Sequence, residues 1–283
     1  MHSFKLNETE ILSNQDWTFP TNIAYGPGRL KEIGKICNDL NIKNPLIVTD
    51  KGSPKLPFII NLQSYLTNSN VKSDLFFDIS PNPREDEVSN GCKKFKIGNH
   101  DAIIAIGGGS AMDGGKLICL TANNNVPLRD FEFELTPPKI SSENPFPKII
   151  TIPTTAGTGA ETEITAMVTY LKEGMKFCMW HPDVRPSLAL IDPELTIGLP
   201  ANLTAWTGAD ALIHGIEGYC VPGFNPMCDG AALEGLSLIS KSLVAAVEDP
   251  GNLVARGGMH VGSCLAGISF LKGLGLVHAI AHM

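Results

Sequence analysis

The sequence has little that would place the protein outside a reducing compartment. Its seven cysteines include no CxxC pair and their number is odd, so free thiols are expected rather than a disulfide framework. Residues 1–14 have no apolar core, so no signal peptide is expected. The longest apolar stretch, 264–271, ends at Lys272 before it could cross a bilayer. These absences predict a cytoplasmic protein without a membrane partner.

The chain also has no surplus of positive charge. It holds 22 Lys and Arg against 29 Asp and Glu, a net charge of -7, which argues against a general attraction to nucleic acid or to anionic membranes. With 283 residues, of which 43% are hydrophobic, it can bury a sizeable core of one or two domains. A disordered chain and a small disulfide-stapled domain are thereby excluded.

Short β-branched runs alternate with helical patterns over the first two-thirds of the chain, which is typical of a parallel sheet covered by helices. Residues 123–147 carry no period and predict a long surface loop. The runs 164–171 and 176–181 predict a hairpin. The expected strands are 45–50, 74–80, 102–107 and 148–153, and the expected helices between them are 29–40 and 110–122.

After 187–196 the strand pattern stops, and helices are expected at 204–220, 231–248, 253–270 and from 274 onward. The sequence therefore predicts an α/β domain over 1–197 and an all-α domain over 198–283. The last helical pattern stops without a C-cap, so the chain is expected to end inside an element.

Two strand ends are followed by loops rich in hydrogen-bond donors. In 101–116 (DAIIAIGGGSAMDGGK) a strand runs through three glycines into a helix, whose first amides favour a phosphate. In 151–161 (TIPTTAGTGAE) a strand leads into threonines and glycines. Either loop alone could be an ordinary turn, but ligands of open α/β sheets bind beyond the carboxyl ends of the strands. Asp50, at the end of 45–50, could bind a ribose hydroxyl or be a solvated acid in a turn.

Two pairs of side chains at helical spacing lie in the helical part. Asp210 and His214 are four residues apart, as are His278 and His282, so each pair shares a helix face. Each pair alone would be interpreted as hydrogen-bonded core residues. Together they form a carboxylate and imidazole set suited to a divalent metal, and the spacing does not choose between iron and zinc.

With these motifs in order, the chain resembles the iron-containing (group III) alcohol dehydrogenase family from about Phe19 to its last residue. The resemblance rests on VTDKG (48–52), PNP (81–83), GGGSAMDGGK (107–116), PTTAGTGAE (153–161), KF (176–177), IDPELT (191–196), TGADALIHGIEGY (207–219) and GLVHAIAH (275–282). It implies an N-terminal α/β domain that binds NAD or NADP, a helical domain that binds a divalent metal, and a reaction in the cleft between them. This is the architecture of dehydroquinate synthase.

The resemblance also assigns residues by position. Asp210, His214 and His278 match metal ligands, and His282 matches a catalytic histidine on the substrate side. Asp50 matches the acid that selects against a 2′-phosphate. The remaining cofactor contacts match Asn82, Gly108, Gly109, Ser110, Asp113, Thr154, Thr155, Thr158, Lys176 and Leu195.

Two departures from the family pattern stand out. Glu163 occupies a position where many members have a cofactor-contacting threonine. The family's fourth metal ligand is a histidine beyond the segment GLVHAIAH, so the chain is expected to be a C-terminally truncated member.

The expected function is an NAD-linked alcohol dehydrogenase or aldehyde reductase with Fe(II), or alternatively Zn(II), acting on a small alcohol or aldehyde as a homo-oligomer. NADP is the less favoured cofactor. Two alternatives stay open: a glycerol dehydrogenase-like enzyme of the same fold, and an inactive truncated fragment that binds nucleotide.

Overall fold

The computed structural model describes residues 12, 15–18, 21–223 and 225–281. The chain forms two compact units. The sheet unit comprises residues 30–152 and 163–190, and the helical unit comprises residues 1–29, 153–162 and 191–283. Each unit therefore draws on more than one segment of the sequence. The expectation that a domain over 1–197 binds the nucleotide and a domain over 198–283 binds the metal stays a prediction.

The sheet unit is built on strands in the order β9-β6-β5-β3-β4. Strand β3 (Pro45–Asp50) pairs in parallel with β4 (Asp74–Ile79) and with β5 (Ala102–Gly107), and β6 (Lys148–Pro153) pairs in parallel with β9 (Leu188–Ile191). Every residue of β5 is buried, as expected for an apolar strand covered on both faces. The predicted parallel sheet is confirmed.

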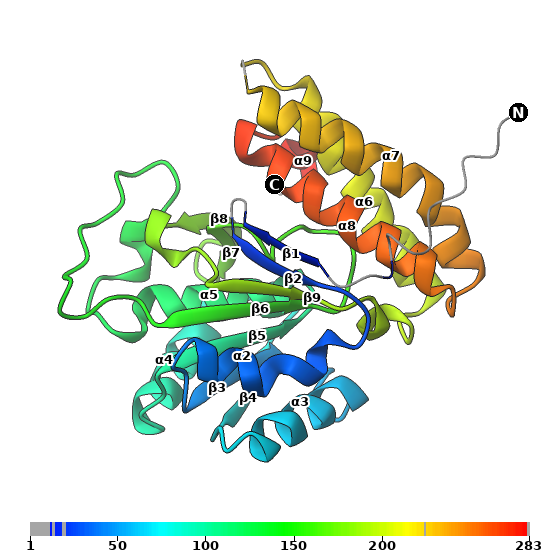
Figure 1. Ribbon diagram of the computed structural model, residues 1–283. Helices are drawn as coiled ribbons and strands as arrows, with labels where there is room; N and C mark the ends of the chain where they lie inside the picture. Colours follow the sequence, from blue (N-terminus) through cyan, green and yellow to red (C-terminus); the bar gives the residue numbers. More distant parts are fainter. Residues whose placement is uncertain (1–11, 13–14, 19–20, 224, 282–283) are drawn as a thin grey trace, which may run out of the picture. The chain divides into compact units, whose positions relative to one another are not determined.

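Helices cover both faces of this sheet. In Figure 1, α2 (Ile33–Asp39) and α3 (Pro57–Asn68) lie in front of it and α5 (Gly109–Ala122) lies behind it. Helix α4 (Glu85–Ile97) packs against α5 and β4. Helices α3 and α4 were not predicted. Helix α4 buries only Glu87, Val88, Gly91 and Phe95, a sparse set that gives little apolar period.

A hairpin and three short 3-10 turns are the remaining elements described with the sheet unit. The predicted long loop contains one 3-10 turn, η2 (Leu128–Phe131), and η3 (Pro182–Val184) follows the hairpin. The hairpin forms as predicted from β7 (Thr165–Tyr170) and β8 (Met175–Trp180), with Thr165 opposite Trp180. The 3-10 turn η1 (Arg29–Glu32) precedes α2, so the helix predicted over 29–40 is α-helical only in its second part.

The helical unit contains α6 (Ala201–Cys220), α7 (Pro226–Glu248), α8 (Leu253–Ser269), η5 (Phe270–Lys272) and α9 (Leu276–Ala281). Its core is made of small and apolar side chains, which let α6, α7 and α8 pack closely: Ala156, Ala211, Ile239, Ala246, Ala255, Met259 and Ala266. The same unit holds η4 (Pro193–Thr196) and an antiparallel pair, β1 (Gln15–Thr18) with β2 (Asn22–Tyr25), which the sequence analysis did not predict.

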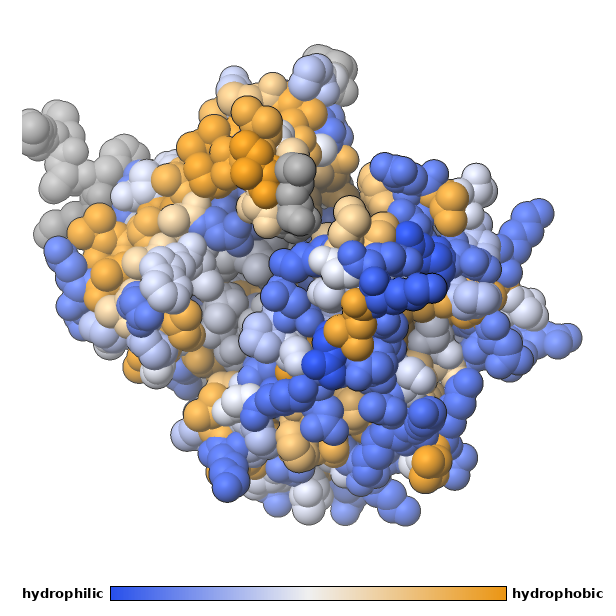
Figure 2. All heavy atoms as spheres, turned by 180° about the vertical axis from the view of Figure 1, so that it is seen from behind, coloured by the Kyte–Doolittle hydropathy of each residue, from blue (hydrophilic) through white to orange (hydrophobic). Residues whose placement is uncertain are grey.

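Helix α7 is long and apolar enough to cross a membrane by length and composition, with a third of its most apolar window buried. The core helix of a soluble protein passes the same test, and α7 packs against α6 and α8. Large apolar side chains of the helical unit are nevertheless exposed, among them Trp206, Met227, Leu276 and Ile280. Figure 2 shows apolar side chains gathered on the outside of these helices.

Gly159 offers a test of packing in the helical unit. Its φ is +66°, and a Cβ there would lie 2.5 Å from the Cα of Gly267 in α8. Gly174, in the hairpin turn, has a φ of +65° and open space around it. Gly174→Ala should therefore cost only the left-handed conformation, about 1 kcal/mol, whereas Gly159→Ala should cost about 2 kcal/mol more through the backbone clash.

Urea denaturation of the two variants and the parent chain measures both costs. Equal losses in free energy of unfolding would mean that the close approach of Gly159 to α8 does not exist in solution.

Candidate metal centre and nucleotide-binding loops

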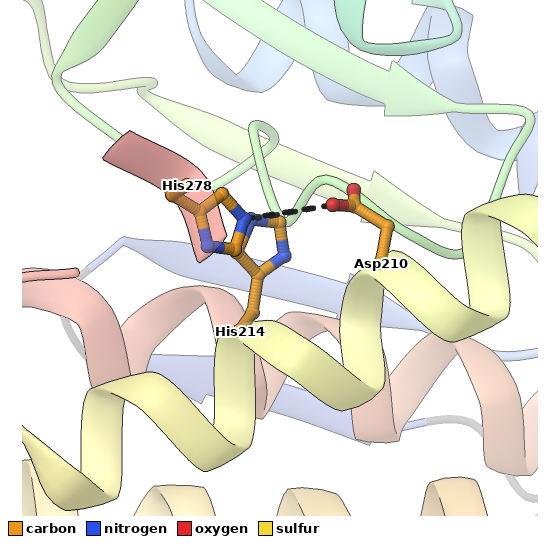
Figure 3. A group of neighbouring side chains, drawn as sticks. All are labelled: Asp210, His214 and His278. Carbon is orange, nitrogen blue, oxygen red and sulfur yellow. Dashed lines mark ion pairs between the residues drawn. The ribbon is translucent and has the colours of Figure 1, made fainter. Parts of the chain in front are cut away.

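Helix α6 presents three polar side chains along one face. Asp210, His214 and Glu217 are separated by four and then three residues, so they lie on consecutive turns of the same side. His278 comes from the short helix α9 and is buried beside them. Figure 3 shows the rings of His214 and His278 overlapping, with Asp210 directed toward them. The structure thus brings together the three residues predicted as metal ligands.

The distances in this triad match those of a metal site. The Oδ1 atom of Asp210 lies 3.8 Å from Nε2 of His214 and 3.6 Å from Nε2 of His278. Donor atoms of all three residues lie within 4.8 Å of one another. Ligand atoms bound at about 2.1 Å with tetrahedral angles are about 3.4 Å apart. The side chains therefore fit a divalent ion with little movement.

The rest of the surroundings fixes the orientation of each imidazole ring. The Nδ1 atom of His214 lies 3.2 Å from the carbonyl oxygen of Gly157, which can only accept, so Nδ1 carries the proton and Nε2 keeps its lone pair. The rings of His214 and His278 stack with centroids 4.3 Å apart and an interplanar angle of 16°. The ring of Phe270 packs on His214 at 4.8 Å. The proton on Nδ1 therefore makes Nε2 the ring atom of His214 that can bind a metal.

Glu217 holds His278 in the same way. Its Oε2 atom lies 2.5 Å from Nδ1 of His278, and its carboxylate also accepts from the backbone amides of Gly275, Val277 and His278. It therefore caps the first turn of α9. Burial opposes the ionisation of Glu217, but the bonds from the His278 ring and from these amides outweigh it and lower its pKa to about 2. A carboxylate behind a ligating histidine is the usual way in which such a ring is oriented.

Sequence reasoning missed Glu217, although a signal was present. It stands three residues after His214 and seven after Asp210, on the face already assigned to the metal. The spacing alone does not reveal that Glu217 reaches α9, because its partners lie about sixty residues further along the chain.

In the sheet unit, the glycine loop and Asp50 lie together. Helix α5 begins at Gly109, after Gly107 with a φ of +145°. A Cβ at Gly107 would lie 3.3 Å from Oδ2 of Asp50, so the turn and the acid are neighbours. The hydroxyl of Ser110 donates to the carbonyl of Pro81, which places the loop containing Asn82 beside the helix start. The N-terminus of α5 presents the free amides that a phosphate needs.

The other residues of the sheet unit predicted to contact the cofactor differ in burial and in charged neighbours. Asp113 forms an ion pair with the buried Lys116 at 3.9 Å, and burial raises its pKa to about 6. Lys176 lies half-buried on β8, near enough to Asp113 to influence its pKa. Glu163, which stands where many family members have a cofactor-contacting threonine, is buried.

The threonine loop and Leu195 belong to the helical unit. Thr154 is buried, Thr155 and Thr158 are half-buried, and the hydroxyl oxygen of Thr158 accepts from the amide of Ala160. Leu195 lies half-buried in η4. The predicted catalytic residue His282 lies outside the described residues.

Comparison with known proteins agrees with this chemistry. Residues 20–193 match the family model described as iron-containing alcohol dehydrogenase, and residues 204–283 match the C-terminal model of the Fe-containing alcohol dehydrogenase family. A 1,3-propanediol dehydrogenase of Klebsiella pneumoniae is 36% identical over 270 residues, which cover 94% of this chain and 68% of that protein. An NAD-dependent methanol dehydrogenase of Bacillus methanolicus is 34% identical over 264 residues, covering 93% and 68%.

The fold has the same relatives. The crystal structure of a 1,3-propanediol oxidoreductase superposes with a TM-score of 0.88 at 34% identity, covering 96% of this chain and 69% of that one. The similarity thus extends through both units. The chain belongs to the iron-containing alcohol dehydrogenase family.

Proposed function

We propose that the chain acts as a metal-dependent, NAD-linked alcohol dehydrogenase, and in reverse as an aldehyde reductase, on small primary or secondary alcohols. The observation that carries this proposal is the triad of Asp210, His214 and His278, whose donor atoms converge within 4.8 Å. Its two nitrogens and one oxygen suit Fe(II), the metal in the family's description, and would also accept Zn(II).

The protein's residues have distinct tasks in this reaction. Asp210, His214 and His278 would hold the ion, while Glu217 and the carbonyl of Gly157 keep the two Nε2 atoms directed at it. A divalent ion held there would make an alcohol hydroxyl easier to deprotonate. Oxidation then removes a hydride from the alcohol carbon, which NAD accepts, and a proton from the hydroxyl, which we propose His282 relays to water.

Cofactor binding is assigned to the loops at the strand ends. The amides of Gly108, Gly109 and Ser110 would bind the pyrophosphate at the start of α5. We propose contacts from Asn82, Asp113, Thr154, Thr155, Thr158, Lys176 and Leu195 as well. Asp50 would bind the ribose and disfavour NADP by charge repulsion.

The proposal also covers the location and the assembly of the protein. None of the seven cysteines, all of which the structure describes, is placed in a disulfide, which supports a cytoplasmic location. The exposed apolar side chains of the helical unit support assembly into a homo-oligomer (Figure 2).

His278→Ala tests the metal assignment. The variant should lose bound metal and alcohol oxidation and still bind NAD, because the glycine loop and Asp50 lie in the sheet unit. Metal content after dialysis against a chelator, NAD calorimetry and turnover with added Fe(II) or Zn(II) measure the three properties. His100→Ala, outside the triad, should keep its metal. Full activity of His278→Ala would refute the metal site, and NAD binding without turnover in the unaltered chain would favour the non-enzymatic alternative.

Glu217→Gln tests the support behind His278. The amide can still accept from the ring but carries no charge, so metal affinity should fall by about 10 to 100-fold. Competition between the protein and a chelator for Co(II) gives the Kd. Glu234→Gln removes an exposed carboxylate of α7 and should leave the Kd unchanged. Equal Kd values for both variants would show that Glu217 does not act on the metal.

Asp50→Gly tests the cofactor preference. Removing the carboxylate should narrow the ratio of kcat/KM for NAD over NADP by roughly ten-fold, since like charges in a partly desolvated site repel. Asp50→Asn should produce most of the same change because the charge is its cause. An unaltered ratio in both variants would exclude Asp50 as the discriminator.

A further inference from the structure

The carboxylate that ends β3 has only neutral partners. In the described part of the chain, Oδ1 of Asp50 accepts from the amide of Gly52 at 2.9 Å and Oδ2 accepts from the hydroxyl of Ser53 at 2.8 Å. No cation pairs with it among these residues. Its negative charge is therefore held in place without being neutralised.

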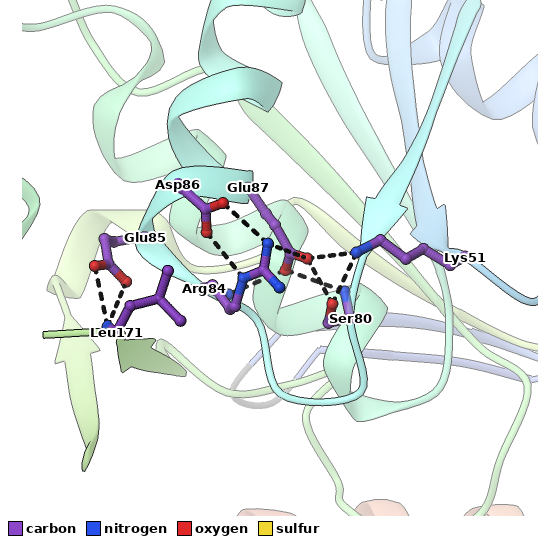
Figure 4. A network of polar contacts seen from close by, with 7 residues as sticks. All are labelled: Lys51, Ser80, Arg84, Glu85, Asp86, Glu87 and Leu171. Carbon is purple, nitrogen blue, oxygen red and sulfur yellow. Dashed lines mark hydrogen bonds and ion pairs between the residues drawn. The ribbon is translucent and has the colours of Figure 1, made fainter. Parts of the chain in front are cut away.

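The nearest cation along the chain, Lys51, is directed elsewhere. Its amide donates to the carbonyl of Ile79 at the end of β4, which fixes the start of its side chain. Its Nζ atom lies 2.7 Å from Oε1 of Glu87 and 2.9 Å from the hydroxyl of Ser80. Figure 4 shows the Lys51 side chain extended from the end of the strand toward the first turn of α4.

Glu87 is a rigid partner for that lysine. Its side chain is only 3% exposed, and its Oε2 atom accepts from the amides of Ser80 and Arg84 while Oε1 accepts from the Ser80 hydroxyl. Burial opposes its ionisation, but the bonds from Lys51, Ser80 and the two amides outweigh it and lower its pKa. Glu87 thus stays charged and cannot follow Lys51 if the lysine moves.

The second cation of this edge is bound as well. The guanidinium of Arg84 makes two bonds of 2.9 Å to the carboxylate of Asp86 and lies 3.5 Å from Oε1 of Glu87. Both cations shown in Figure 4 are therefore engaged by acids of α4.

We propose that Glu87 is a positioning residue for cofactor specificity, which keeps the Lys51 ammonium away from Asp50 and from the 2′-phosphate of NADP. This inference rests on the proposed use of NAD and on Asp50 as its discriminator. Once released, Lys51 could neutralise Asp50 or pair with the phosphate itself. Either contact removes part of the repulsion that disfavours NADP.

Glu87→Gln is the direct test. The ratio of affinities for NAD and NADP is measured by calorimetry, which needs no turnover, and the ratio of kcat/KM for the two cofactors is measured on the same metal-loaded protein. The variant should shift the ratio toward NADP by about five-fold, the effect of one partly exposed ion pair. Lys51→Met alone should leave the ratio within about two-fold, because that ammonium is already withdrawn. The double variant Glu87→Gln with Lys51→Met should lose the gain.

A merely structural role for Glu87 would weaken both cofactors alike and leave the ratio unchanged. That result, or a shift that persists in the double variant, overturns the proposal. Asp50→Gly, measured beside them, separates the two levels of the argument. If it leaves the ratio unaltered, the proposed discriminator fails; if it shifts the ratio while Glu87→Gln does not, only the role of Glu87 fails.

Ser80→Ala tests the same proposal if the Glu87→Gln variant does not fold. It removes one of the two partners of Lys51 and should shift the ratio in the same direction by about two-fold. A shift that disappears when Lys51→Met is added supports the proposal, and an unchanged ratio overturns it.

Discussion

The bond between Glu217 and His278 is the contact on which the proposed metal site depends. The first amides of α9 and its histidine all donate to one carboxylate of α6. That carboxylate holds the first turn of α9 and, through Nδ1, the ring of His278. The same face of α6 supplies Asp210 and His214, so one helix sets the geometry of the whole triad.

The sheet unit places its charges by a similar arrangement of neighbours. Asp50 is held by Gly52 and Ser53, and the adjacent Lys51 is held by Glu87. In the helical unit, Glu217 orients a histidine proposed to bind the metal; in the sheet unit, Glu87 holds a lysine away from the acid proposed to bind the cofactor. The buried carboxylates of Glu217 and Glu87 are both stabilised by hydrogen bonds from backbone amides at the start of a helix, and Glu87 also accepts from a hydroxyl. These bonds offset the free-energy cost of burying a charge.

Much of the fold and part of the candidate site could be predicted from the sequence. The features that could not be predicted depend on contacts between residues far apart in the sequence. The buried strands β3, β5 and β6 and the shared helix face of Asp210 and His214 are local signals, and the structure confirms both. That these side chains bind a metal stays a prediction. Helix α4 escaped prediction because a polar helix on a sheet needs few apolar positions. Glu217 and Glu87 escaped prediction because their partners are remote in the sequence. Glu217 contacts a helix about sixty residues later, and Glu87 contacts the lysine that follows β3, 36 residues earlier. The apolar period carries no information about such contacts.

An anomalous difference map, recorded at the iron edge from crystals of the Fe(II)-loaded protein, tests the central claim most directly. The account predicts one strong peak within about 2.2 Å of Oδ1 of Asp210, Nε2 of His214 and Nε2 of His278, with Nδ1 of His278 still bonded to Glu217. A peak elsewhere in the chain, or a peak at this place bound by other atoms, would contradict it.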